Sequence, residues 1–166
     1  VQELCESNTK NIKTIDNLQN SLKLTNQKLN KREMDVGEIS TFTASSHWDG
    51  SWLPNFALFK SEQAWHSRHK EDQNVIAHFP RQCVVFGVTT RGRGSGHNQF
   101  IRTYKLEYLD GKNIWHIIGT FIGNSDMNSL QRNDFEPVSA HALRLSVLSY
   151  NEHPVMKLAI HGYCDQ

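Results

Sequence analysis

The side chains best suited to chemistry begin in a short polar segment that contains two tryptophans. His47, Trp48 and Asp49 are followed by Trp52, among serine, glycine and proline residues that are typical of a loop. Regular structure does not require an indole there. Trp48 is therefore the better ligand candidate, while Trp52 is equally compatible with capping the core. An indole face can stack on the apolar face of a sugar ring, and polar neighbours can bond to its hydroxyl groups.

A second segment, residues 91–99, adds cationic and amide side chains. It has three glycines and no large apolar side chain, which predicts an exposed loop and neither a helix nor a strand. Arginine and histidine without an acidic neighbour suit a carboxylate or a phosphate. With Arg68 from a third polar segment, the ligand-binding candidates are His47, Trp48, Asp49, Trp52, Arg68, Arg91, Arg93, His97 and Asn98.

Strands are expected on both sides of the loop 91–99. Residues 84–90 form an apolar, β-branched run that is typical of a strand buried on both faces. After the loop, Tyr104, Leu106 and Tyr108 alternate with polar residues, as in a half-buried strand. The loop is therefore predicted to be the tip of a rigid β-hairpin.

Other short β-rich runs occur along the same part of the chain, separated by turn residues, and no helical pattern follows Gly37. They span residues 38–44, 75–79, 113–121, 143–147 and 156–160. This pattern predicts an all-β domain over residues 36–166, an antiparallel β-sandwich or jelly roll.

Residues 1–35 show a different periodicity. From Val1 to about Met34 there is no proline, glycine or aromatic residue, and apolar residues recur at steps of three and four, most strongly from Ile15 to Leu29. Carrying this heptad register on would place Val36 at its last seam position. The narrow seam predicts a coiled-coil helix that forms a homo-oligomer. The alternative is one amphipathic helix packed on its own domain, which requires a wider apolar stripe.

Composition excludes several classes of partner. Residues 36–166 carry twelve basic and twelve acidic side chains, so general nucleic-acid binding is not expected. No apolar run is long enough to span a bilayer, and no secretory signal pattern is visible. Because the chain starts at Val1, we expect a fragment of a longer protein. An intracellular location is favoured, and an extracellular one stays open if an upstream signal was removed.

Catalysis, metals and cofactors are not expected. The glycines at 92, 94 and 96 precede a period-two strand and not a helix that could hold phosphate, and no catalytic motif is present. His66 and His69 lack a third metal ligand and are interpreted as part of a solvated loop. Three scattered cysteines, Cys5, Cys83 and Cys164, form neither a zinc site nor a disulfide framework.

A family resemblance covers residues 38–164 and rests on many short motifs in a fixed order. They are Ala44-Ser45-Ser46, Ala64-Trp65, Gly87 to Arg93, Tyr104 to Tyr108, Asp110-Gly111, Trp115, Phe121, Gly123-Asn124, Ala142 to Leu145, Gly162 and Cys164. In this order the chain resembles discoidin domains, also called coagulation factor V/VIII type C domains. The resemblance implies a β-sandwich of about eight main strands with ligand-binding spikes at residues 47–55, 59–63 and 91–99.

The chain departs from this family at two places. Extracellular members form a disulfide between a cysteine just before the first strand and the terminal cysteine. Of this pair the chain has only the terminal one, Cys164, so Cys83 and Cys164 are expected to be free thiols. Members with a structural calcium use an acidic residue near the position of Lys60 and a glutamate in the last strand, where this chain has Ala159. A calcium site is therefore not expected.

The resemblance implies a non-catalytic recognition module with its ligand at the spikes. We expect a lectin-like or adhesion module that binds carbohydrate and is made multivalent by the coiled coil. The alternative is protein or anionic phospholipid recognition through the same loops. A membrane surface ranks below sugar and protein, because only Leu53, Phe56 and Phe59 offer apolar side chains to a bilayer.

Overall fold

The computed structural model describes residues 12–19, 32–50 and 52–164, and the chain divides into two units, residues 1–32 and 33–166. In the first unit residues 12–19 are helical, with Ile15 and Leu18 exposed. Most of the predicted coiled coil over residues 1–35 lies outside the described residues. It therefore stays a prediction.

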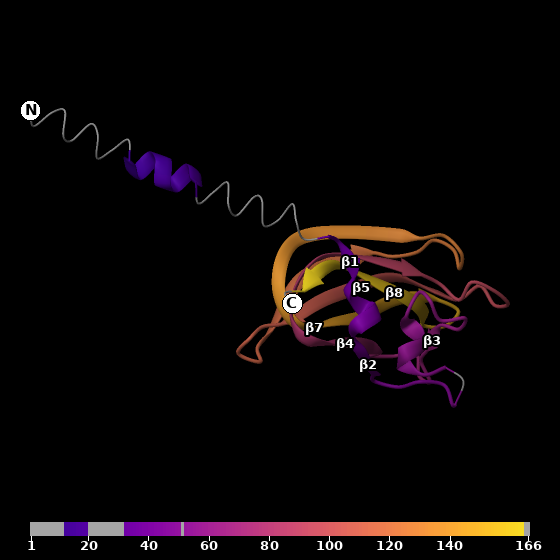
Figure 1. The fold of residues 1–166 in the computed structure, drawn as a ribbon. Helices are drawn as coiled ribbons and strands as arrows, with labels where there is room; N and C mark the ends of the chain where they lie inside the picture. Colours follow the sequence, from indigo (N-terminus) through magenta and orange to yellow (C-terminus); the bar gives the residue numbers. More distant parts are fainter. Residues whose placement is uncertain (1–11, 20–31, 51, 165–166) are drawn as a thin grey trace, which may run out of the picture. The chain divides into compact units, whose positions relative to one another are not determined.

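The second unit is built from antiparallel strands (Figure 1). Its elements are β1 (Met34–Asp35), the 3-10 turn η1 (Val36–Ile39), β2 (Thr41–Ala44), the 3-10 turn η2 (Pro54–Ala57), β3 (Trp65–His66), β4 (Asn74–Arg91), β5 (Phe100–Leu109), β6 (Trp115–Ile122), β7 (Gln131–Asn151) and β8 (Val155–Cys164). The strand order is β1-β8-β4-β7-β5-β6, with β2 paired to β4 and β3 to β8. The predicted all-β fold of about eight strands is confirmed.

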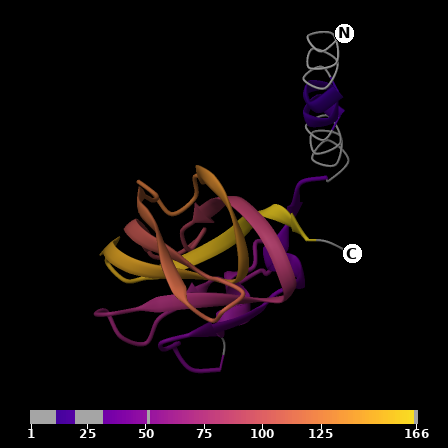
Figure 2. The same ribbon diagram turned by 90° about the vertical axis from the view of Figure 1, so that its left-hand side faces the viewer.

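The strand β4 serves two parts of the sandwich. Its first half, residues 75–78, pairs with β2, and its second half, residues 83–91, pairs with β8, while β7 lies beside both halves. The register shifts between His78 and Cys83, where the strand bends. In Figure 2, β4 (pink) curves round the side of the sandwich from one layer to the other. Such bending lets one strand contribute to both layers of the core.

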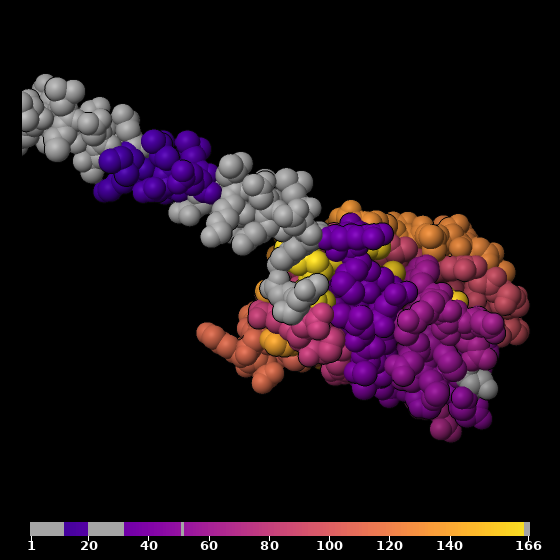
Figure 3. All heavy atoms as spheres, in the orientation of Figure 1, coloured from indigo at the N-terminus to yellow at the C-terminus, as the bar shows by residue number. Residues whose placement is uncertain are grey.

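The core is lined by inward-facing residues of these strands. Trp65, Tyr104 and Met156 are fully buried, and each large apolar side chain of this kind stabilises the fold by about 1.5–3 kcal/mol. The segment 36–64, indigo to purple in Figure 3, covers much of the face shown there. Among the described residues no helix is long and apolar enough to cross a membrane.

The β-sandwich unit begins before residue 36. The carboxylate of Asp35 accepts hydrogen bonds from the backbone N–H groups of Gly37 and Ile160, both at 2.8 Å. Val36 is fully buried in the core. The placement of Val36 at a seam position of the coiled coil is therefore wrong, because its side chain packs inside the sandwich.

The prediction of free thiols at Cys83 and Cys164 is also wrong. The two residues form a disulfide, with their Cα atoms 4.2 Å apart. They lie directly opposite one another where β4 pairs with β8. The absence of the family's staple to a cysteine before the first strand therefore does not leave Cys164 free, because it bonds to a cysteine 81 positions earlier on the neighbouring strand.

Candidate functional site

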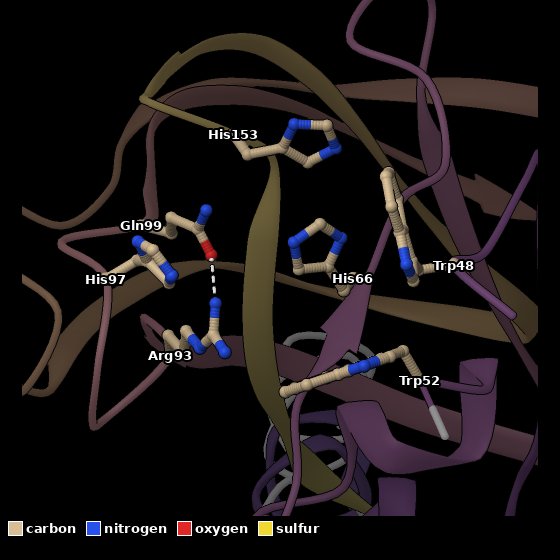
Figure 4. A pocket seen from close by; sticks show the side chains of 7 residues that line it. All are labelled: Trp48, Trp52, His66, Arg93, His97, Gln99 and His153. Carbon is tan, nitrogen blue, oxygen red and sulfur yellow. Dashed lines mark hydrogen bonds between the residues drawn. The ribbon is translucent and has the colours of Figure 1, made fainter. Parts of the chain in front are cut away.

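Loops at one end of the sandwich enclose a hollow of about 290 Å³, which we call the first hollow (Figure 4). Four segments form it: the β2–β3 loop, β3, the β4–β5 loop and the β7–β8 turn. Its lining side chains are Trp48, Trp52, His66, Arg93, His97, Gln99 and His153. Residues from distant parts of the sequence therefore face one another across it.

The β2–β3 loop is fixed to β3 by hydrogen bonds around Ser46. The Ser46 hydroxyl accepts from the backbone N–H of Arg68 at 3.0 Å, and its carbonyl accepts from the indole N–H of Trp65 at 2.9 Å. Two residues later, the backbone N–H of Trp48 donates to the carbonyl of His66 at 2.8 Å. Because Trp65 is fully buried, this loop is anchored to the core.

The β4–β5 loop holds Arg93 in place. Its backbone N–H donates to the carbonyl of Gln99 at 3.0 Å, and its guanidinium donates to the Gln99 side-chain oxygen at 2.8 Å (Figure 4). Gly92 makes the loop this tight, because a Cβ atom there would lie 2.7 Å from the Gln99 carbonyl oxygen. Gly94 has a φ of +85°, a backbone conformation that residues with a side chain rarely adopt.

The two tryptophans present their rings differently. Trp48 is 47% exposed, and it meets His66 and His153 in T-shaped contacts with ring centroids 5.5 and 6.2 Å apart. Trp52 is half-buried and lies under the guanidinium of Arg93, 4.9 Å from the ring centroid. Neither indole is a buried core residue, unlike Trp65. The face of Trp48 is thus available to a ligand.

Two histidines lie between the tryptophans and the β4–β5 loop (Figure 4). His66 belongs to β3 and His153 to the β7–β8 turn, and their rings stack with centroids 4.4 Å apart. The interpretation of His66 as part of a solvated loop is wrong, since it is only 9% exposed. Burial lowers the pKa of His66, and the nearby charges of His153 and Arg93 lower it further. Burial also lowers the pKa of His153, with a smaller effect from Lys70.

The Trp48 indole also lines a second hollow, of about 330 Å³, with Asp49 and Arg68. Both charged side chains are exposed. Trp48 is the residue that the first and second hollows share. Six of the nine predicted ligand-binding residues therefore line one hollow or the other: Trp48, Asp49, Trp52, Arg68, Arg93 and His97.

The other three predicted residues line neither hollow. The imidazole Nδ1 of His47 lies 3.0 Å from the carbonyl oxygen of Trp48. Arg91 is half-buried, and Asn98 offers its backbone carbonyl to the Asn151 side chain at 2.6 Å. His47 and Asn98 therefore contact neighbouring backbone or side-chain groups, whereas the buried Nε of Arg91 has no hydrogen-bond partner among the described residues.

Sequence reasoning missed three lining residues, namely His66, Gln99 and His153. Gln99 closes the predicted spike 91–99, so its position in that loop was the available signal. The two histidines come together only because β3 pairs with the start of β8, with His66 opposite Val155. No local pattern in the sequence announces that pairing.

Among the described residues, no group of three or more histidine, cysteine, aspartate or glutamate side chains is placed to hold a metal ion. His69 is exposed, and His66 is committed to the stack with His153. The site therefore offers an aromatic face, a fixed guanidinium and two buried imidazoles. These side chains are suited to binding polar, ring-shaped groups.

Comparison with known proteins identifies the family. Residues 41–160 match the F5/8 type C domain, and this match covers more than half of the chain. The chain belongs to the F5/8 type C, or discoidin, family, as the sequence resemblance predicted. Fold and family define a non-catalytic binding module.

Lactadherin is a relative at the level of sequence. The protein of Rattus norvegicus is 28% identical over 141 residues, and the match covers 74% of this chain and 33% of lactadherin. The protein of Mus musculus is 26% identical over 123 residues, and the match covers 67% of this chain and 27% of lactadherin. The chain spans about a third or less of the length of these relatives.

Solved structures share the fold at low identity. Discoidin II of Dictyostelium discoideum has a TM-score of 0.74 and 17% identity, over 81% of this chain and 60% of that one. The module CpGH89CBM32-5 of Clostridium perfringens, in complex with GalNAc-β-1,3-galactose, has a TM-score of 0.64 and 20% identity, over 78% and 99%. The family 32 CBM of C. perfringens NanJ, in complex with galactose, has a TM-score of 0.64 and 17% identity, over 80% and 100%.

Proposed function

We propose that this domain is a carbohydrate-recognition module and that the first hollow holds a sugar ring. One observation carries the proposal: the exposed indole of Trp48 and the fixed guanidinium of Arg93 line the same hollow. Sugar recognition requires an aromatic face for the apolar side of the ring and directional partners for its hydroxyl groups. Both are present at one end of the sandwich.

The polar groups of the first hollow are preorganised. Arg93 is held between the ring of Trp52 and the side-chain oxygen of Gln99, so a ligand does not have to order it on binding. The guanidinium donates hydrogen bonds. His66 has one ring nitrogen committed to the Ser67 carbonyl, and its ring also interacts with the Gln99 side chain, so the imidazole is held in place as well.

The structural relatives support this choice of ligand class. Two of the similar modules hold galactose or GalNAc-β-1,3-galactose. Their identity to this chain is 17–20%, so the sugar that this chain prefers has to be measured. Galactose and this disaccharide are the first probes.

The test is calorimetric titration of the Trp48→Ala variant with galactose. We expect binding to weaken by about 1–3 kcal/mol, the loss typical of a contact aromatic, with little change in melting temperature. Ile117→Ala is the matched control, because it removes another exposed apolar side chain, 69% exposed on β6, and should bind as the wild type does. A large loss of stability with binding preserved in the folded fraction would place Trp48 in the core and remove the proposed site.

The second candidate is recognition of an anionic group on a protein or phospholipid. It is favoured by Arg93 and His97, because no acidic side chain of the described residues lines the first hollow with them. A bilayer would also meet Leu53, which is 39% exposed, but Phe56 and Phe59 are half-buried. Binding to phosphatidylserine vesicles, with no binding across a glycan array, would favour this candidate over the first.

We also propose that the protein is multivalent and that it lies in an oxidising compartment. A coiled coil before β1 would tether several sites, and avidity then exceeds single-site affinity by about 10²–10⁴ where the geometry allows. The disulfide between Cys83 and Cys164 is of a kind that persists in oxidising compartments. We therefore propose an extracellular setting in place of the intracellular one that the sequence favoured.

A further inference from the structure

We propose that the second hollow is a second sugar subsite, so that the ligand is a glycan of at least two units that contacts the indole of Trp48 from both hollows. This inference rests on the proposed function of the first hollow. It extends that function from a single sugar ring to a chain, and it assigns Asp49 and Arg68 to the unit next to the one bound by Arg93.

The sizes of the hollows favour two linked units. The first measures about 290 Å³ and the second about 330 Å³. The first therefore lies just below, and the second just above, the lower limit of the range of about 300–1,000 Å³ that small-molecule sites span. Since Trp48 lines both, a ligand longer than one ring can fill the two hollows while it stays in contact with the same indole.

Trp48, which lines both hollows, is held in place by its backbone and by its ring. The backbone N–H of Trp48 is bound to the carbonyl of His66 at 2.8 Å, and its ring meets the stacked imidazoles of His66 and His153. The backbone N–H of Arg68 is bound to the Ser46 hydroxyl at 3.0 Å, so the start of its side chain is fixed as well. The second hollow is therefore part of the anchored loop structure.

The charged groups of the second hollow are free to bind a ligand. Within the described residues, neither Asp49 nor Arg68 has an ion-pair partner, although both line the same hollow. The Asp49 carboxylate accepts hydrogen bonds and the Arg68 guanidinium donates them. Together they match a unit that offers both kinds of group, such as neighbouring hydroxyls or an N-acetyl group with its N–H and carbonyl.

The charged groups differ between the two hollows, and this difference determines which sugar unit lies in which hollow. Among the residues that the structure describes, the first hollow has a guanidinium and no carboxylate, and the second has one of each. We therefore assign the first hollow to an acceptor-rich sugar unit and the second to a unit with vicinal hydroxyls or an N-acetyl group. GalNAc-β-1,3-galactose contains an N-acetylated unit and a plain one, and it is the probe that we choose.

The experiment compares galactose with GalNAc-β-1,3-galactose by calorimetry on the full chain. The wild type should bind the disaccharide about tenfold more tightly than galactose, a gain of about 1.4 kcal/mol from hydrogen bonds between the second unit and the charged groups of the second hollow. Arg68→Ala and Asp49→Asn should each remove most of that advantage and leave galactose affinity unchanged. Arg81→Ala is the matched control, because it removes an exposed arginine at the bend of β4 that lines neither hollow.

Two results would overturn the second subsite. One is equal affinity of the wild type for galactose and the disaccharide. The other is an Arg68→Ala variant that loses galactose binding too, which would place Arg68 in the first hollow. Failure of the wild type to bind either sugar would instead remove the proposed function, and the second subsite with it. Galactose binding that depends on Trp48 but gains nothing from the second unit would remove the subsite alone.

Discussion

His66 and His153 share one hydrogen-bond acceptor. The Nδ1 atom of His66 and the Nε2 atom of His153 each lie 2.8 Å from the backbone carbonyl oxygen of Ser67. A carbonyl only accepts, so both nitrogens carry their hydrogens, and the stacked rings are fixed by a single backbone group. Because the rings are stacked at 4.4 Å, a positive charge on one disfavours a charge on the other.

The first prediction concerns pH. The pKa of His66 and that of His153 are lowered from the ordinary value of 6.5, mainly by burial. Below about pH 6.5 the unfolded chain therefore binds more protons at these residues than the folded chain does, and the free energy of unfolding falls as the pH drops. The stabilisation is fully present above that pH. We expect a lower melting temperature at pH 5 than at pH 7.5.

The His153→Gln variant is the control for this effect. Its side-chain amide can still donate to the Ser67 carbonyl but does not titrate. The pH-dependent fall in melting temperature should therefore be smaller than in the wild type. An identical fall in both proteins would show that His153 does not contribute to it.

The second prediction concerns the disulfide between Cys83 and Cys164. Replacing Cys164 by alanine should lower the free energy of unfolding by about 2–4 kcal/mol, because the bond restricts the unfolded chain. Chemical denaturation of oxidised wild type, reduced wild type and variant measures this, and the last two should agree. Intact mass without reductant tests the bond itself. A mass that corresponds to three free thiols would contradict the structure.

The third prediction concerns calcium. The ammonium group of Lys157 donates to the Ser61 carbonyl beneath the spike 59–63, and Lys157 is only 7% exposed. Its pKa is lowered, first by burial and then by the charge of Arg91. The Lys157 ammonium group, a cation of the protein itself, therefore already binds a carbonyl of this loop. We expect a chelator such as EDTA to leave both melting temperature and sugar affinity unchanged.

The variant Lys157→Met supplies the complementary test. It keeps the apolar stem but leaves the Ser61 carbonyl without its donor, which costs about 1–3 kcal/mol when the group is buried. The melting temperature should fall accordingly. Lys112→Met, on the exposed turn between β5 and β6, should have no such effect. A fall in melting temperature with EDTA in the wild type would show that a metal ion supports the fold after all.

Strand patterns made the fold predictable from sequence. The alternation of Tyr104 and Leu106 with polar residues corresponds to β5, in which both side chains are fully buried. The separate strands expected at 75–79 and 84–90 are one bent strand, β4. Pro80, Arg81 and Gln82 resemble a break in the strand pattern, but they are the exposed bend between its two halves.

The site was predictable only in part, for a physical reason. Trp48 and Arg93 stand out because they lie in polar loops where packing does not require them. His66 and His153 have no such local signal, since their meeting depends on the pairing of β3 with β8. The Cys83–Cys164 bond was missed for the same reason, because its two strands are neighbours only in the folded sheet.

The last prediction concerns the oligomer. In the described helix 12–19, the seam residues Ile15 and Leu18 are 53% and 64% exposed in the single chain. A second copy of the helix would cover them and remove their apolar surface from water. We therefore expect light scattering to give a multiple of the 19.1 kDa chain mass. Ile15→Asn should shift the mass toward the monomer, whereas Asp16→Asn, off the seam, should not.

The same Ile15→Asn variant should keep its affinity for soluble galactose and lose avidity for a galactose-coated surface. A monomeric mass for the full chain that stays monomeric when residues 1–32 are deleted, which leaves the sandwich unit intact, would refute the coiled coil.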